Sequence, residues 1–180
     1  NWAAYSNATS SFAGFDNFTA NSIRLVYEDD YASVESGWFI ENEEICQASY
    51  FNGEYTTAVR AAFFCLFRSP ADAQQNGRFE VTARREDTFY SPAFGLYFGE
   101  DGSFSSYYTF IIFPDTQSYA LIKYIDGEGA FGITWDNFAN TPWLYSDQIN
   151  TFTSPNKLTV ERDGTLLSLW INDSFIGSFD

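Results

Sequence analysis

The chain has 180 residues, 45% of them hydrophobic and 21% aromatic, which predicts one folded domain with a substantial core and excludes a disordered protein. Its 24 acidic residues outnumber 9 basic ones, and the resulting net charge of −15 disfavours nucleic acid and anionic membrane surfaces as partners. Histidine is absent, which excludes Ser-His-Asp and Cys-His catalysis and the usual zinc sites.

Several features predict an exported, extracellular or cell-surface protein. No apolar run approaches the roughly 20 residues needed to span a bilayer, and the absence of methionine suggests a processed chain whose leader has been removed. Cys46 and Cys65 lack metal-site spacing, so we expect either a structural disulfide or two buried thiols. Three sequons predict N-glycosylation, at Asn7, Asn17 and Asn172.

The first 25 residues, NWAAYSNATSSFAGFDNFTANSIRL, carry little charge and no hairpin signal, but their aromatic residues are spaced along the segment. The next stretch, YEDDYASVESGW, places Glu28, Asp29, Asp30 and Glu35 close together. Glycosidases use paired carboxylates, whereas calcium binds oxygen-rich turns. Solvated turn carboxylates are the third interpretation.

From residue 44 onward, turn-forming residues separate short apolar and aromatic runs, a pattern typical of an all-β protein. EICQASYFNGEYTTAVR predicts a type I′ hairpin around Asn52-Gly53. In RFEVTARRE, Phe79, Val81 and Ala83 should face the core. The runs AAFFCLF and YYTFIIF are apolar on both faces and predict central strands, and AFGLYFGED and SYALIKYIDGEG predict two more strands.

Residues 129–156 form a long connection that contains Trp135 and Trp143. Connections of this length are usually functional or packed by their own side chains. KLTVERDGTLLSLWIN then predicts a second hairpin around Asp163-Gly164. Many short strands with regular turns predict two antiparallel sheets packed face to face, in which we expect Trp38 and Trp170 to be core anchors.

Five segments follow one another along the chain: VYEDDYASVESGW, NGEYTTAVR, FEVTARRE, AFGLYFGEDGSFSSYYTFIIFPDTQSYALIKYIDGE and NKLTVERDGTLLSLWINDSFIGSF. In this order they resemble the elements of non-catalytic bacterial members of the concanavalin A-like lectin/glucanase superfamily. The resemblance covers about residues 26–179. It implies a jelly-roll β-sandwich, whose members are mostly secreted and often bind glycans, a property that fold alone does not assign.

The chain departs from that family at both ends. The family normally has one more strand after GSF, whereas this chain stops at Asp180, and residues 1–25 precede the usual start. We therefore expect a sandwich over residues 26–180 with a missing strand. Residues 1–25 should either fill that gap or act as a donor strand to a neighbouring subunit.

The resemblance also bears on chemistry. Catalytic glucanases of this superfamily carry E-x-D-x-x-E on one strand, but here Ser33 stands at the third carboxylate position, so no catalytic residue is expected. No cofactor is required. A structural calcium ion, if one binds, would take Asp29 and Asp30, since the superfamily often uses its opening strand in this way. Four aromatic residues are candidates for stacking on sugar rings: Trp143, Tyr145, Tyr107 and Tyr108.

Three functions follow in order of preference. The first is a non-catalytic structural or adhesive subunit that forms a homo-oligomer or homopolymer, such as a filament, through β-strand complementation. The second is a monomeric carbohydrate-binding module. The third and most remote is a glycoside hydrolase.

Overall fold

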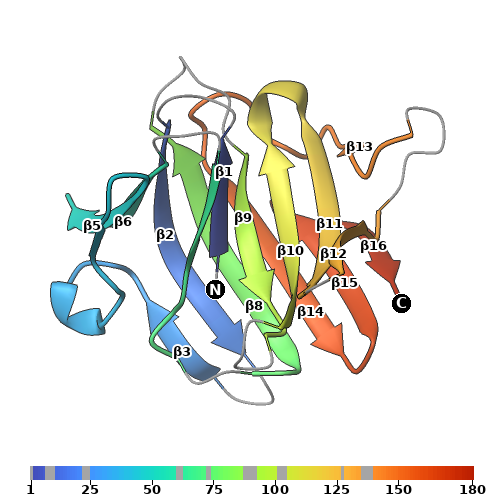
Figure 1. Cartoon of the computed structure of the whole chain (residues 1–180), viewed down its shortest axis with the longest axis horizontal. Helices are drawn as coiled ribbons and strands as arrows, with labels where there is room; N and C mark the ends of the chain where they lie inside the picture. The colour runs from blue at the N-terminus through green and yellow to red at the C-terminus, as the bar shows by residue number, and fades with distance from the viewer. Residues whose placement is uncertain are drawn as a thin grey trace.

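Two antiparallel sheets packed face to face make up the fold, which confirms the predicted all-β sandwich and is compatible with a jelly roll (Figure 1). The structure is a computed structural model of the whole chain. It describes residues 2–6, 11–21, 25–59, 63–71, 74–86, 93–100, 105–126, 128–134 and 140–180.

Within the described residues, one sheet has seven strands in the order β12-β11-β10-β9-β1-β7, with β13 paired to β11 outside this order. The strands are β1 (Trp2–Ser6), β7 (Phe63–Phe67), β9 (Ala93–Phe98), β10 (Ser106–Phe113), β11 (Ser118–Ile125), β12 (Gly129–Gly132) and β13 (Leu144–Tyr145). The run YYTFIIF forms an interior strand, β10, as predicted.

The other sheet has nine strands in the described part of the chain, in the order β16-β15-β14-β8-β2-β6-β5-β4, with β3 paired to β2. They are β2 (Ser11–Asn21), β3 (Leu25–Asp29), β4 (Glu41–Asn42), β5 (Cys46–Phe51), β6 (Glu54–Val59), β8 (Gly77–Arg85), β14 (Asn156–Asp163), β15 (Leu166–Ile171) and β16 (Ser174–Phe179). Two short 3-10 helices, η1 (Val34–Ser36) and η2 (Pro114–Thr116), lie in connections.

Side chains from the facing sheets fill the core. On β8, Phe79, Val81 and Ala83 are buried and the residues between them are half-buried, as the period-2 pattern predicts. They face fully buried side chains such as Leu96 on β9 and Phe110 on β10. Full burial of a large apolar side chain stabilises the fold by about 1.5–3 kcal/mol, so this alternation is the main reason that these strands pack as two layers.

The two predicted hairpins are present. Asn52 and Gly53 join β5 to β6 with φ values of 53° and 77°, the positive angles that a type I′ turn requires. The second hairpin joins β14 to β15, and Gly164 has a φ of 62° at its turn. A third hairpin, β15 to β16, turns at Asn172 and Asp173, whose φ values are 50° and 65°.

Two expectations about packing were wrong. In the run AAFFCLF, the described residues Phe63–Phe67 form β7, which ends the seven-stranded sheet in the described part of the chain and is not central. It is apolar because Cys65 and Phe67 are buried where β7 is tied to the opposite sheet.

Trp38 is a core residue with 3% exposure, but Trp170 is half-buried on the outer face, since its neighbours Leu169 and Ile171 take the inward positions on β15.

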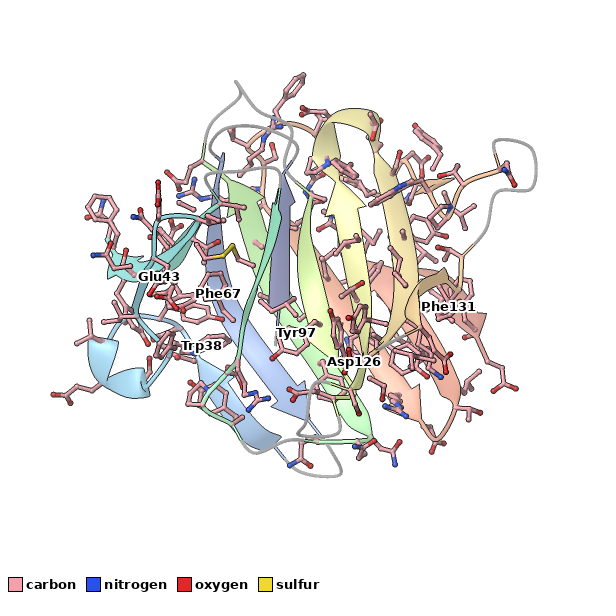
Figure 2. The ribbon with its side chains drawn as sticks, viewed as in Figure 1. Trp38, Glu43, Phe67, Tyr97, Asp126 and Phe131 are labelled. Carbon is pink, nitrogen blue, oxygen red and sulfur yellow. A yellow bond between two sulfur atoms is a disulfide. The ribbon has the colours of Figure 1, made fainter. Side chains whose placement is uncertain are left out.

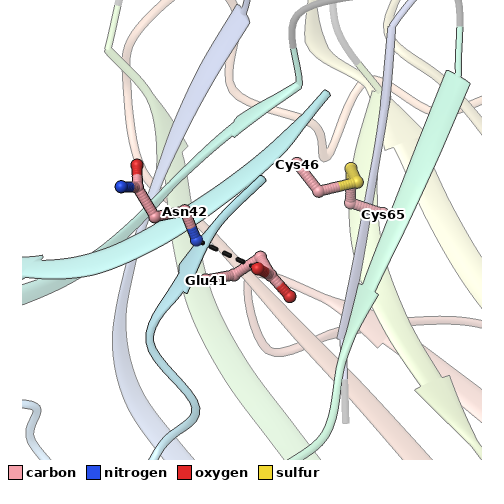
Figure 3. The surroundings of a disulfide bond; sticks show 4 residues. All are labelled: Glu41, Asn42, Cys46 and Cys65. Atoms are coloured by element: carbon pink, nitrogen blue, oxygen red, sulfur yellow. Dashed lines mark hydrogen bonds between the residues drawn. A yellow bond between two sulfur atoms is a disulfide. The ribbon is translucent and has the colours of Figure 1, made fainter. Parts of the chain in front are cut away.

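A disulfide joins the two sheets, which confirms the bridge between the two cysteines (Figure 3). Cys46 lies on β5 and Cys65 on β7, with their Cα atoms 5.9 Å apart. A second tie is the bidentate ion pair between Arg85 on β8, which is fully buried, and Asp115 in η2, with N–O distances of 2.8 and 2.7 Å. Both ties hold the layers in one relative position.

Candidate functional site

The N-terminal segment supplies an interior strand to each sheet. β1 lies between β7 and β9 and pairs antiparallel with both, so that Ala4 stands opposite Cys65 on one side and Phe94 on the other. Removal of β1 would expose the backbone donors and acceptors of two strands at once. An unsatisfied buried group costs about 1–3 kcal/mol, so β1 is needed to complete the seven-stranded sheet.

β2 has the same role in the other sheet. Over its eleven residues it pairs with β8 on one side and with β6 and then β3 on the other. Phe15, for example, stands opposite Tyr55 of β6 and Ala83 of β8. β1 and β2 are therefore interior strands in the sheets of their own chain, and no composition shift or turn signal in the sequence indicated this interior position.

The acidic stretch after β2 forms a closed hydrogen-bonded turn. Asp29 is buried, and its carboxylate accepts hydrogen bonds from the Tyr31 amide and the Tyr27 hydroxyl, each at 2.8 Å. The Trp38 indole donates to the Tyr27 oxygen at 3.1 Å. Burial, together with the nearby Asp29 carboxylate, raises the pKa of the Tyr27 and Tyr31 hydroxyls, which stay neutral. Asp29 thus fixes a turn.

The predicted calcium and glycosidase sites gain no further support from this geometry. Asp30 and Glu28 are exposed, and one Asp30 oxygen accepts the Ala32 amide at 2.9 Å. Within the described residues, no three histidine, cysteine, aspartate or glutamate side chains come together to hold a metal ion. The carboxylates of Asp29 and Asp30 accept hydrogen bonds within the turn itself.

Of the four aromatic candidates for sugar stacking, only one presents an open ring. Tyr107 is buried and stacks on Tyr124 with ring centroids 4.9 Å apart. Tyr108 stacks on Phe98, and the cationic groups of Arg162 and Lys123 lie 5.3 and 5.6 Å from its ring centroid.

The other two candidates lie in the connection before β14. Trp143 is half-buried, with its ring edge-on to Phe113 at 4.6 Å. Tyr145 is 68% exposed. It is therefore the candidate whose ring face can meet a sugar.

Tyr145 borders a groove of about 500 Å³ at the end of the sandwich where β16 lies. Its lining consists of Tyr119, Tyr145, Ser146, Asp147, Gln148, Ser174, Phe175 and Ile176. Gln148 organises the polar side, because its amide donates to Asp147 at 2.9 Å and accepts from the Ser174 hydroxyl at 2.7 Å. Phe175 is 59% exposed. The sequence did not predict it as a site residue, because the motif NDSF indicates only a glycosylation site at its asparagine.

The three sequons fall in different environments. Asn7 lies outside the described residues, and Asn17 lies within β2. Asn172 is in the β15–β16 turn, where its amide nitrogen donates to the Gln148 carbonyl at 2.6 Å and to Asn156 at 3.0 Å. Its oxygen accepts the Lys157 amide at 2.8 Å. A glycan on the Asn172 nitrogen would have to form before this turn closes.

No protein-family model matches the chain, and comparisons with curated proteins and with solved structures find no match. No helix among the described residues is long and apolar enough to cross a membrane. The geometry of the chain itself therefore carries the functional argument.

Proposed function

We propose that the chain is an extracellular, non-catalytic β-sandwich of the concanavalin A-like type, which serves as a structural or adhesive subunit and associates with copies of itself through β-strand complementation. The disulfide supports an oxidising, extracellular location. The turn role of Asp29 supports a chain without a catalytic carboxylate pair.

One observation carries the proposal: exposed large apolar side chains gather at the two ends of the nine-stranded sheet. Phe39, Ile40, Ile45 and Phe51 lie on or directly beside β4 and β5. At the other end are Phe175 on β16 and Leu166 on β15. Apolar groups gathered at the ends of a sheet, where backbone groups are open to pairing, favour a protein partner over a soluble monomer.

Light scattering and negative-stain electron microscopy of the full chain, over a range of concentration and salt, test the proposal. We expect oligomers or filaments whose size grows with concentration. A wild-type chain that stays monomeric throughout would contradict the proposal.

A cysteine pair can establish whose N-terminal strands fill each sandwich. Asp16 of β2 stands opposite Thr82 of β8, so cysteines at both positions should form a disulfide. We expect the oxidised chains to run as single chains on a denaturing gel, because β1 and β2 pair with strands of their own chain. A ladder of linked chains would instead mean donation to a neighbour. Cysteines at Ser168 and Ser178, which face each other within the β15–β16 hairpin, are the matched intrachain control.

A second candidate, a carbohydrate-binding module, is favoured by the groove beside Tyr145. An exposed ring next to carboxylate, amide and hydroxyl groups is an arrangement suited to a sugar, whose C–H face stacks while its hydroxyls hydrogen-bond. A glycan array tests it with the wild-type chain and with Tyr145→Ala. Binding that is lost in the variant supports a carbohydrate module, and no binding on a broad array counts against it.

A further inference from the structure

The outer edge of β16 carries no charged side chain and no proline that would oppose pairing with another strand. β16 ends the order of the nine-stranded sheet, and no described strand pairs with its outer side. Its six residues, SFIGSF, include no charged residue and no proline. Edge strands are commonly protected by lysine, proline or a bulge. β16 carries one of these features, a bulge in which Ile176 is the extra residue between Phe175 and Gly177, and it lacks the other two.

The turn before β16 fixes which backbone groups point outward. In a two-residue hairpin the pair that flanks the turn, here Ile171 and Ser174, exchanges its hydrogen bonds within the hairpin. The next pair, Trp170 and Phe175, then directs its amides and carbonyls away from the partner strand. The Phe175 backbone therefore faces outward, next to its own exposed ring, which packs edge-on against Trp170 at 5.4 Å.

The opposite end of the same sheet is also incompletely covered. β4 has only two residues, Glu41 and Asn42, and pairs with Gln47 and Ala48 of β5. The chain directly before β4 carries Phe39 and Ile40, which are 61% and 58% exposed. Figure 1 shows β5, the neighbour of β4, and β16 on opposite sides of the molecule, and Figure 2 labels Glu43, directly after β4, on the side of β5.

The directions of the two end strands match. The order from β16 to β4 contains eight strands, each antiparallel to the next, so β16 and β4 run in opposite directions. A second copy that continues the twist of the sheet, by a screw rotation along it, would bring its β16 antiparallel to β4. Antiparallel pairing is the more stable arrangement per residue.

We propose that β16 of one copy pairs antiparallel with residues 39–42 at the β4 end of the next copy, so that the nine-stranded sheet continues from subunit to subunit. This inference rests on the proposed self-association and names its interface. The contact joins two different surfaces and does not close on itself, so it produces a filament. Eight strands at about 4.8 Å each give a rise of roughly 38 Å per subunit.

A lysine at either edge should block this pairing, since a charged side chain there opposes the approach of another strand. We expect Phe175→Lys and Phe39→Lys each to raise the concentration needed for assembly by roughly tenfold or more, as measured by light scattering. Phe152→Lys is the matched control, because Phe152 is 60% exposed but lies in the loop between β13 and β14. Far-ultraviolet circular dichroism and thermal melting establish that each variant is folded.

Mixing the two edge variants identifies the direction of pairing. Phe175→Lys keeps a competent β4 end and Phe39→Lys keeps a competent β16 edge, so an equimolar mixture should form heterodimers and no filaments. If only Phe175→Lys blocks assembly, β16 pairs with another β16 and the head-to-tail arrangement is wrong. If the folded edge variants assemble like the wild type, the interface is elsewhere and self-association itself still stands. If the wild type never assembles, the proposed function fails as well.

Discussion

The disulfide offers the most direct quantitative test of the sandwich, because it crosses between the sheets at one end of the fold. Cys46 and Cys65 are 19 residues apart in sequence, and on the chain-entropy account a loop of this length stabilises the folded state by about 3 kcal/mol. At about 2.1 cal/mol/K per residue, 180 residues have an unfolding entropy of roughly 0.38 kcal/mol/K. The double variant Cys46→Ala/Cys65→Ala should therefore melt about 8 °C lower than the wild type.

Differential scanning calorimetry with and without a reducing agent measures this effect. Reduction should lower the melting temperature of the wild type towards that of the double variant, and should leave the double variant unchanged, which controls for other effects of the reductant. A double variant that melts within about 2 °C of the oxidised wild type would refute the reasoning. It would mean that packing around the aromatic cluster of Tyr31, Trp38 and Tyr55 already holds this end of the sheets together.

Three further predictions concern the same core. Asp115→Ala removes the carboxylate that meets the fully buried Arg85 guanidinium, and should cost about 3 kcal/mol in urea unfolding, whereas Asp147→Ala on the surface should cost little. Gly95→Ala places a Cβ atom 1.9 Å from the Phe110 carbonyl oxygen, so the chain should fail to express in folded form or lose several kcal/mol, and a stable variant would contradict the β9–β10 register. Burial raises the pKa of Tyr97 from 10.0 to about 12, so its contribution to stability is complete below pH 10 and is lost as the pH rises towards 12. Tyrosinate absorbance at 295 nm is compared between the wild type and Tyr97→Phe, and a difference of one tyrosinate already present near pH 10 would contradict this.

Local signals predicted the local structure well. Asn-Gly and Asp-Gly located two hairpins, and the alternation in RFEVTARRE identified which side of β8 faces the core. These features depend on residues close in sequence, where turn geometry and side-chain direction are set by neighbours. The cysteine pairing was also accessible, because the chain has only two cysteines.

The order of strands could not be obtained in the same way. β7 looked central because both its faces are apolar, yet it ends its sheet in the described residues, and β1 and β2 looked like an extension although they lie inside both sheets. The hydrophobic pattern of a strand indicates which of its faces is buried. It does not indicate which strand pairs with it, because that depends on contacts between residues far apart in sequence. Trp170 differs from its prediction for a related reason. Its size favours the core, but side chains alternate along β15, and Leu169 and Ile171 on either side of it face inward.

The strong negative charge of the chain is consistent with the proposed pairing of β16 with the β4 end. Residues 25–59, which include the β4 end, contain eight acidic residues and no basic one, whereas β16 has no charge at all. Exposed charges act over a Debye length of about 8 Å at physiological ionic strength, so repulsion would oppose most approaches between subunits. This repulsion would be weakest where the uncharged edge of β16 meets Phe39 and Ile40. The acidic surface would then restrict pairing to one orientation, and added salt should strengthen assembly, as opposed to the weakening expected of an interface held by ion pairs.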